Sequence, residues 1–252
     1  MILWTHWFNA ISLLRPAFSR QSTFLWFALC CVGMSVRTDH LGVSSVVRAL
    51  ALRGRCYDNL LNCCHSSAVK IPVLTSFWAQ TVLSLFGQRI ERVAGRPVLI
   101  VDGKKTPKEG KKMPGVKSLH QESESNSKPS YIMGHSWQAV SILVHAGQTL
   151  FSLPLSIRLH EGVIFSNRDK RTILDKMITL VDELCMPEPC YIVADRYYAS
   201  GGVIKQVLKQ GNHLITRAKS NCAANYPPPK RRVKPKRGRL LYRTLFQRCF
   251  SD

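Results

Sequence analysis

Apolar residues follow two different spacings along this chain, one typical of helices and the other of strands. Between residues 39 and 86 they recur about every four positions in three segments, the last of which opens at Pro72 and stops at Gly87. This spacing predicts a small helical domain, which either contacts DNA or is plain core. Residues 1–36 are rich in Trp, Phe and Leu without a clear period, so we expect helices there and assign them no role.

The rest of the chain alternates short apolar runs of strand length with amphipathic segments. The predicted strands are 97–101, 137–145, 150–159, 190–194 and 213–216. One predicted helix is capped by Ser166 or Asn167, has an apolar face from Ile173 to Leu184 and ends at Met186-Pro187, and a second is 201–209. The gap between the second and third strands contains Ala-Gly-Gln, which is typical of a hairpin. The predicted fold is therefore α/β, with the order β-β-β-α-β-α-β after the helical domain.

Two of the predicted strands end in an aspartate, Asp102 after the first and Asp195 after the fourth. A right-handed crossover through the intervening helix would return the fourth strand parallel to the first. Neighbouring strands lie about 4.8 Å apart, so the two carboxylates could share divalent cations, and hard ions such as Mg²⁺ or Mn²⁺ prefer oxygen ligands. The pair indicates a phosphoryl-transfer site, whereas Asp102-Gly103 taken alone is more typical of an ordinary turn.

The charge balance identifies a class of partner. The chain of 252 residues contains 36 Lys and Arg against 15 Asp and Glu, a formal net charge of +21. Such an excess indicates a polyanion, first nucleic acid and second a membrane surface. The apolar segment 24–36 falls short of the ~20 residues of a spanning helix, so we expect no membrane partner. Nine cysteines without a C-x-x-C motif indicate reduced thiols in a cytoplasmic protein.

Basic residues gather in two regions that we expect to contact the DNA backbone. The first is residues 103–135, predicted as a long loop, and the second is the tail after residue 221. The candidate DNA-binding residues are Lys104, Lys105, Lys108, Lys111, Lys112, Lys117, Lys230, Arg231, Arg232, Lys234, Lys236 and Arg237. A solvated charged loop is the alternative for the first region.

Three stretches of sequence carry a resemblance to a known family. They are VDGKKTPKEGKKMPGVKSLHQESESNSKPSYIMGHSWQAV from Val101, YIVADRYYAS from Tyr191 and HLITRAKSN from His213. Together they resemble the DDE-type transposases of bacterial insertion sequences, also described as DDE superfamily endonucleases. The resemblance extends over residues 39–221, and the family's order of elements agrees with the predicted order.

The resemblance implies an RNase H-like fold and a protein that cuts and joins duplex DNA at transposon ends. The family uses two aspartates and one glutamate to hold two Mg²⁺ ions. By position, Asp102 matches the first acid and Asp195 the second, so we expect both to be catalytic metal ligands for Mg²⁺ or Mn²⁺. We expect a cytoplasmic, nucleoid-associated protein, with a homodimer left open.

The third acid of the family has no counterpart in this sequence. The family's glutamate lies on a helix beyond the fifth strand, whereas this chain continues there with a proline run and a basic tail whose only acid is Asp252. Five acids precede the fifth strand and therefore do not match the third position, namely Glu122, Glu124, Glu161, Asp182 and Glu183. We therefore interpret the chain as a truncated copy.

Four regions and three hypotheses result. The regions are 1–36, unassigned; 37–92, helical; 93–221, an incomplete RNase H-like catalytic domain; and 222–252, a basic tail. The first hypothesis is a Mg²⁺-dependent DNA transposase that cleaves and transfers strands. The second is a non-catalytic DNA-binding remnant of such an enzyme, favoured by the missing glutamate. The third is a basic membrane-associated protein that uses residues 1–36.

Overall fold

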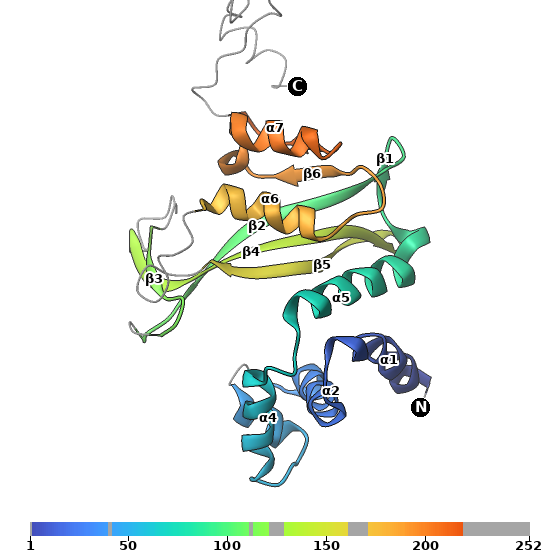
Figure 1. Cartoon of the computed structure of the whole chain (residues 1–252), viewed down its shortest axis with the longest axis vertical. Coiled ribbons are helices and arrows are strands. Elements are labelled where there is room, and N and C mark those ends of the chain that lie inside the picture. The colour runs from blue at the N-terminus through green and yellow to red at the C-terminus, as the bar shows by residue number, and fades with distance from the viewer. Residues whose placement is uncertain (1, 40–41, 111–112, 121–128, 161–170, 219–252) are drawn as a thin grey trace, which may run out of the picture.

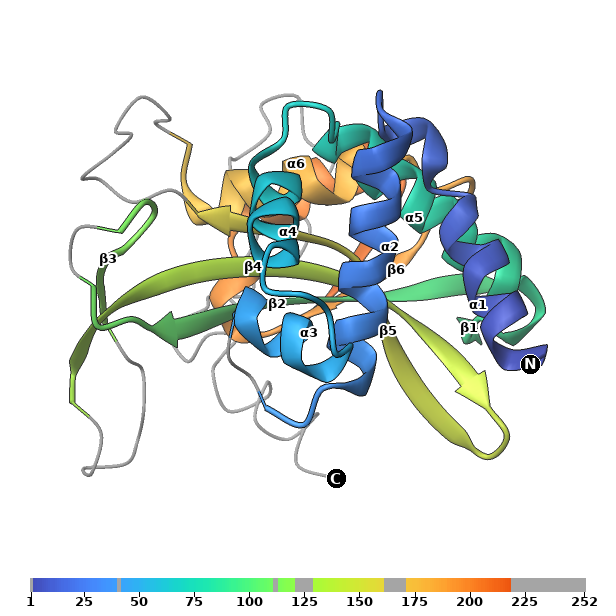
Figure 2. The same cartoon turned by 90° about the horizontal axis from the view of Figure 1, so that it is seen from below.

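Helix α5 (Ile71–Phe86) lies against a mixed sheet, and the other helices of the first third of the chain lie on the side of α5 away from that sheet (Figure 1). The structure is a computed structural model, and it describes residues 2–39, 42–110, 113–120, 129–160 and 171–218. Seen from the helical side, the helices of the first third lie in front of the strands, and one end of the sheet extends beyond them (Figure 2). The sheet therefore has an end that these helices leave uncovered.

The helical part is arranged around α2 (Gln21–Val36), which contacts two of the other helices. Its elements are α1 (Ile2–Ser12), η1 (Arg15–Ala17), α2 (Gln21–Val36), α3 (Val43–Ala49), α4 (Cys56–His65), α5 (Ile71–Phe86) and η2 (Gly87–Arg89). Helix α2 packs on α3 and α4. Gly33 permits a close approach to α3, because a Cβ at this position would lie 2.4 Å from Val46 Cγ1. The helices expected before residue 87 are thus confirmed, including those expected in residues 1–36.

The sheet is built on β2 (Arg96–Pro107), which has an antiparallel neighbour on one side and a parallel neighbour on the other. The antiparallel neighbour is β4 (Tyr131–Ala146) and the parallel one is β6 (Tyr191–Ala194). Strands β5 (Thr149–His160) and β3 (Lys117–His120) pair with the other side of β4, β7 (His213–Ile215) pairs with β6, and the short β1 (Arg92–Val93) pairs with β2.

The connections between these strands contain the remaining helices. Helix α6 (Ile173–Glu183) joins β5 to β6, and η3 (Arg196–Tyr198) and α7 (Gly201–Lys209) join β6 to β7. The sequence order of the main elements is β2, β4, β5, α6, β6, α7, β7, and the strands lie in the order β5-β4-β2-β6-β7. This arrangement confirms the predicted α/β class and the RNase H-like mixed sheet.

One face of the sheet packs against α6 and α7. Along β4 the buried side chains alternate with half-buried ones, and Val140 and Ile142 are fully buried. They belong to one apolar cluster with Leu180 of α6 and Val207 of α7. Complete burial of such a side chain contributes about 1.5–3 kcal/mol, so this packed face holds β2 and β6 in place.

The start of α6 differs from the predicted cap. Thr172 is the N-cap: its hydroxyl accepts a hydrogen bond from Asp175 N, and the Asp175 carboxylate accepts one from Thr172 N. This capping box satisfies N–H groups that have no partner inside the helix. The predicted caps, Ser166 and Asn167, lie outside the described residues, and α6 begins at Ile173 because Thr172 is extended.

The region 103–135, predicted as a long loop, contains strands instead. Strand β2 runs past Asp102 to Pro107 because its ladder with β4 continues from Leu99 opposite Ile142 to Pro107 opposite Gly134. Strand β3 and the first residues of β4 occupy more of the region, while residues 111–112 and 121–128 lie outside the described part. Only the parallel pairing with β6 stops before Asp102, at Val101.

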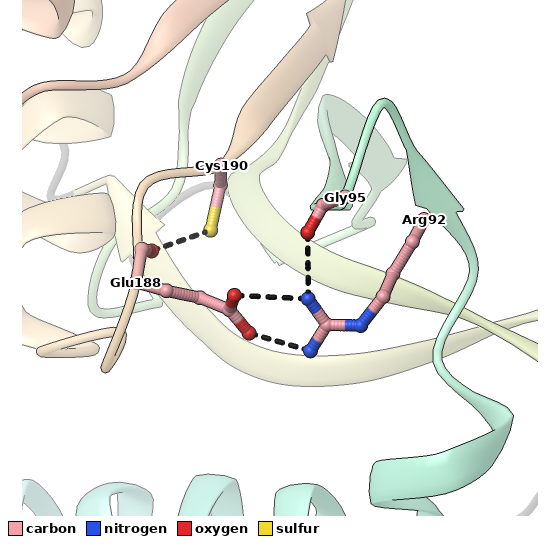
Figure 3. Close-up of polar contacts among 4 residues, drawn as sticks. All are labelled: Arg92, Gly95, Glu188 and Cys190. Carbon is pink, nitrogen blue, oxygen red and sulfur yellow. Dashed lines mark hydrogen bonds and ion pairs between the residues drawn. The ribbon is translucent and has the colours of Figure 1, made fainter.

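An ion pair ties β1, which pairs with the start of β2, to the loop before β6, as Figure 3 shows. The guanidinium of Arg92 donates to both carboxylate oxygens of Glu188, at 2.9 and 2.5 Å, and to the carbonyl oxygen of Gly95 at 2.8 Å. A bidentate pair of this kind fixes orientation as well as distance, and the hydrogen bonds from Arg92 lower the pKa of Glu188. The two strands that carry the acids are therefore tied together near the ends where they begin.

In the part of the chain that the structure describes, every α-helix is either too short or too polar to cross a membrane. The apolar segment 24–36 forms most of α2 and buries Phe24 and Ala28 in an apolar cluster with Leu14 and Phe18. The region boundaries expected at 36/37, 92/93 and 221/222 stay predictions.

Candidate active site

The register between β2 and β6 brings Asp102 and Asp195 together. The last parallel pair of these strands is Val101 opposite Ala194, and each aspartate is the next residue in its strand's sequence. Strands in a sheet lie about 4.8 Å apart, so the two aspartates are neighbours at the carboxyl ends of the parallel pair. The structure thus places side by side two acids that are 93 positions apart in the sequence.

Both carboxylates keep lone pairs that face solvent. Asp102 Oδ1 accepts a hydrogen bond from Gly103 N at 2.7 Å, and Asp195 Oδ1 accepts one from Tyr197 N at 2.9 Å. Asp195 is the N-cap of η3, and its carbonyl oxygen accepts from Thr216 Oγ1 at 2.7 Å. Each acid is therefore oriented by a backbone N–H one or two residues further along the chain, and each remains exposed. Carboxylates with unused oxygens fit a hard divalent cation such as Mg²⁺ or Mn²⁺.

The described residues supply two acids to this site and no third. Among residues 2–39, 42–110, 113–120, 129–160 and 171–218, no group of three or more His, Cys, Asp or Glu side chains is arranged to hold a metal ion. Glu122, Glu124 and Glu161 lie outside these ranges. The pair could therefore hold a cation, with its remaining ligands coming from water, substrate or residues beyond the described part.

A buried tyrosine lies directly behind the acids, and the sequence patterns alone did not single it out. Tyr198 follows Asp195 by one turn of η3 and is only 2% exposed. Its hydroxyl oxygen lies 3.5 Å from where a Cβ on Gly103 would be. Burial raises the pKa of Tyr198 to about 12, a hydrogen bond with the Gln138 side chain works in the opposite direction, and the charges of Asp102 and Asp195 raise it further.

Gln138 connects this tyrosine to the rest of the sheet. It is 3% exposed, lies opposite Gly103 in the β2–β4 ladder, and donates from Nε2 to the carbonyl oxygen of Ile173 at 2.7 Å. Buried polar side chains that satisfy one another give a fixed geometry. The sequence signal for this support was the second tyrosine of DRYYAS, three residues after Asp195.

Only part of the predicted DNA-binding set can be placed. Lys104 and Lys105 extend from β2 directly beyond Asp102 and are exposed, as is Lys108, and Lys105 Nζ donates to the carbonyl oxygen of His120 at 2.6 Å. Lys117 is half-buried in β3. The other candidates lie outside the described residues, namely Lys111, Lys112, Lys230, Arg231, Arg232, Lys234, Lys236 and Arg237. The structure therefore places two exposed lysines, Lys104 and Lys105, within three residues of Asp102 on β2. Lys108 lies six residues beyond Asp102, roughly 20 Å away at the rise of a strand.

Comparison with known proteins gives a family and one structural likeness. The chain resembles a piggyBac transposase, solved by cryo-EM as a synaptic complex with hairpin DNA, at 13% identity and a TM-score of 0.39. The match covers 81% of this chain and 43% of that one, so this chain spans less than half of that transposase. No curated protein matches the chain. The family model described as DDE superfamily endonuclease matches residues 13–248, nearly the whole sequence. The chain therefore belongs to the DDE superfamily endonucleases.

Proposed function

We propose that this protein is the transposase-like protein of an insertion sequence, in which Asp102 and Asp195 hold Mg²⁺ or Mn²⁺ for cleavage and transfer of DNA strands. The observation that carries the proposal is the register of Val101 opposite Ala194, which sets the two exposed carboxylates next to each other. Neighbouring carboxylates repel, and a divalent cation relieves that repulsion. Such an ion, when bound, activates a water and stabilises charge on a phosphodiester.

The proposed substrate is duplex DNA at transposon ends. Lys104, Lys105 and Lys108 follow Asp102 along the same strand or just beyond it and are exposed, so a DNA backbone at the acids would also meet these ammonium groups. The formal net charge of +21 favours the same partner, since lysines and arginines bind DNA by releasing its counterions. Because its proposed partner is DNA, we expect the protein to be associated with the nucleoid.

Metal binding tests the proposal through the stability of the folded chain. A ligand that binds only the folded state, present at about 100 times its dissociation constant, adds about 2.7 kcal/mol. Mg²⁺ or Mn²⁺ should raise the thermal unfolding midpoint of the wild type and raise that of Asp102→Asn or Asp195→Asn much less. Asp58→Asn, an exposed change on α4, is the matched control and should respond like the wild type. Equal metal-induced shifts in wild type and Asp102→Asn would contradict the site.

A second candidate function is DNA binding without cleavage. It is favoured by the two-acid site, because positioning two metal ions for in-line attack requires further ligands. Both candidate functions involve binding to DNA. They differ in whether the protein cleaves DNA strands, which a plasmid-nicking assay measures.

A further inference from the structure

Two side chains join β7 to β6 beyond the three residue pairs of their ladder. Before the ladder, Asn212 Oδ1 accepts a hydrogen bond from Cys190 N at 2.8 Å in a buried position. After the ladder, Thr216 Oγ1 donates to the carbonyl oxygen of Asp195 at 2.7 Å. Strand β7 is therefore attached to both ends of β6, and the second attachment is at one of the two acids of the candidate active site.

Asp195 itself lies just beyond the paired part of β6. Neither the ladder with β2 nor the ladder with β7 includes it, so its position depends on hydrogen bonds outside the sheet. Two of these are local, because Tyr197 N donates to its carboxylate and Tyr198 N donates to its carbonyl oxygen. The hydrogen bond from Thr216 is different, since it comes from a neighbouring strand, 21 positions further along the chain.

The hydrogen bond from Thr216 restrains the turn that orients the carboxylate. A carbonyl oxygen has two lone pairs, and that of Asp195 accepts from Tyr198 N and from Thr216 Oγ1. The first bond closes the turn on itself, and the second fixes the turn against β7. Thr216 is half-buried, which limits the access of competing water to its hydroxyl. A metal ligand supported in this way is held close to its binding geometry before the ion arrives.

We propose that Thr216 is a positioning residue, which holds the Asp195 carboxylate in place for a divalent cation shared with Asp102. The inference rests on the proposed metal site of these two acids. Groups that orient metal ligands through hydrogen bonds typically contribute a factor of about 10–100 in metal affinity. Thr216 acts on the cation only through Asp195, and this role accounts for the threonine in the stretch HLITRAKSN from His213.

Mn²⁺ binding by the full chain, measured by calorimetric titration, tests this role. Thr216→Val nearly preserves the shape of the side chain and removes the hydroxyl, so it should bind Mn²⁺ about 10–100-fold more weakly than the wild type. Thr216→Ser keeps the donor and should bind Mn²⁺ nearly as tightly as the wild type. Asp195→Asn measures what remains when the ligand itself is lost.

Asn212→Ala is the matched control for a general loss of stability. It removes the side chain that attaches β7 to the start of β6, and Cys190 is five residues before Asp195, roughly 17 Å away at the rise of a strand. The buried N–H of Cys190 then lacks its partner, so the thermal unfolding midpoint should fall. The affinity for Mn²⁺ should stay at the wild-type value, because the turn at Asp195 keeps its bond from Thr216.

Amide hydrogen exchange in the absence of metal provides a second measurement. The N–H groups of Tyr197 and Tyr198 both donate to Asp195, so their exchange rates report how often the turn opens. Both should exchange faster in Thr216→Val than in the wild type and at the wild-type rate in Thr216→Ser.

The outcomes separate the role of Thr216 from the proposed function. Wild-type Mn²⁺ affinity in Thr216→Val, together with weakened binding in Asp195→Asn, would overturn the role of Thr216 and leave the metal site intact. Equal affinities in Thr216→Val and Thr216→Ser would also overturn it, because only one of them keeps the hydroxyl. Equal Mn²⁺ binding by the wild type and Asp195→Asn would instead overturn the proposed metal site. Faster exchange in Thr216→Val would then show that Thr216 supports the fold alone.

Discussion

At the scale of single residues, Tyr198 connects the acids to the core. Tyr198 is the last residue of η3, its ring is buried, and its hydroxyl forms a hydrogen bond with the Gln138 side chain. A phenol that is 2% exposed is held neutral, because burial disfavours the charged form. Tyr198 therefore acts as a positioning residue beneath the turn that orients Asp195, and its ionisation links pH to stability.

Replacing Tyr198 by Phe should change the dependence of stability on alkaline pH. The pKa of Tyr198 is raised from 10.0 to about 12 in the folded chain. Its contribution is thus fully present below pH 10 and is lost as pH rises toward 12, an effect of about 2–3 kcal/mol. Tyr198→Phe removes the hydrogen bond and should lower the free energy of unfolding by about 1 kcal/mol at neutral pH. Between pH 10 and 11.5 its free energy of unfolding, measured by urea titration, should fall less than that of the wild type.

Tyr197→Phe is the control for this measurement, since Tyr197 is 40% exposed and lies next to Tyr198. It should retain the wild-type pH profile. A Tyr198→Phe profile parallel to the wild type above pH 10 would show that the buried phenol does not link pH to folding.

At the scale of elements, the sequence predicted the local structure and the parallel pairing of β2 with β6, but not how far β2 pairs with β4. The segments later seen as β6, α7 and β7 were placed to within one residue, because apolar runs and an amphipathic period define them locally. Strand β2 was predicted to stop at Asp102, since Lys104 and Lys105 carry no apolar signal. Its extension to Pro107 depends on pairing with β4, which local periodicity does not report. That Asp102 and Asp195 could be neighbours was predictable because a helical crossover lets the later strand return parallel to β2.

The extended pairing of β2 with β4 depends on Gly134. A Cβ at this position would lie 2.4 Å from the carbonyl oxygen of Thr106 and 3.1 Å from the Cα of Pro107, so the two backbones meet where a side chain would stand. Gly134→Ala should destabilise the chain by about 1–3 kcal/mol through overpacking, measured by urea unfolding. It should also weaken DNA binding, because the same ribbon displays Lys104 and Lys105.

Gly87→Ala provides the contrast for that change. Gly87 is in the right-handed helical region, and a Cβ there meets nothing within 4 Å, so the substitution should be neutral or should stabilise by about 0.4–1 kcal/mol. If Gly134→Ala were as well tolerated as Gly87→Ala, the β2–β4 contact at Thr106 would be looser than the structure shows.

At the scale of the whole molecule, α5 links the helical part to the sheet. Its first half, with Val73 and Phe77, packs on the cluster of α1, η1 and α2, while Ala79 and Val82 belong to the sheet cluster. Trp78 Nε1 also donates to the carbonyl oxygen of Pro154 in β5 at 2.7 Å. Because α5 packs in both apolar clusters, it holds the helical part in a fixed position relative to the sheet that carries the acids.

The chain of 252 residues should bind duplex DNA but nick it very slowly by itself. Asp102 and Asp195 offer two carboxylates, the described residues add no third acid to them, and the only acid in the sequence after β7 is Asp252. Two carboxylates can hold a cation, yet displacements of about 1 Å in a reacting geometry can cost about 100-fold in rate. A plasmid-nicking and strand-transfer assay in Mg²⁺ and Mn²⁺ measures this directly, with Asp195→Ala as the control for contaminating nucleases. Robust nicking by the wild type that disappears in Asp195→Ala would show that the two acids suffice, and would decide between the two candidate functions in favour of the enzyme.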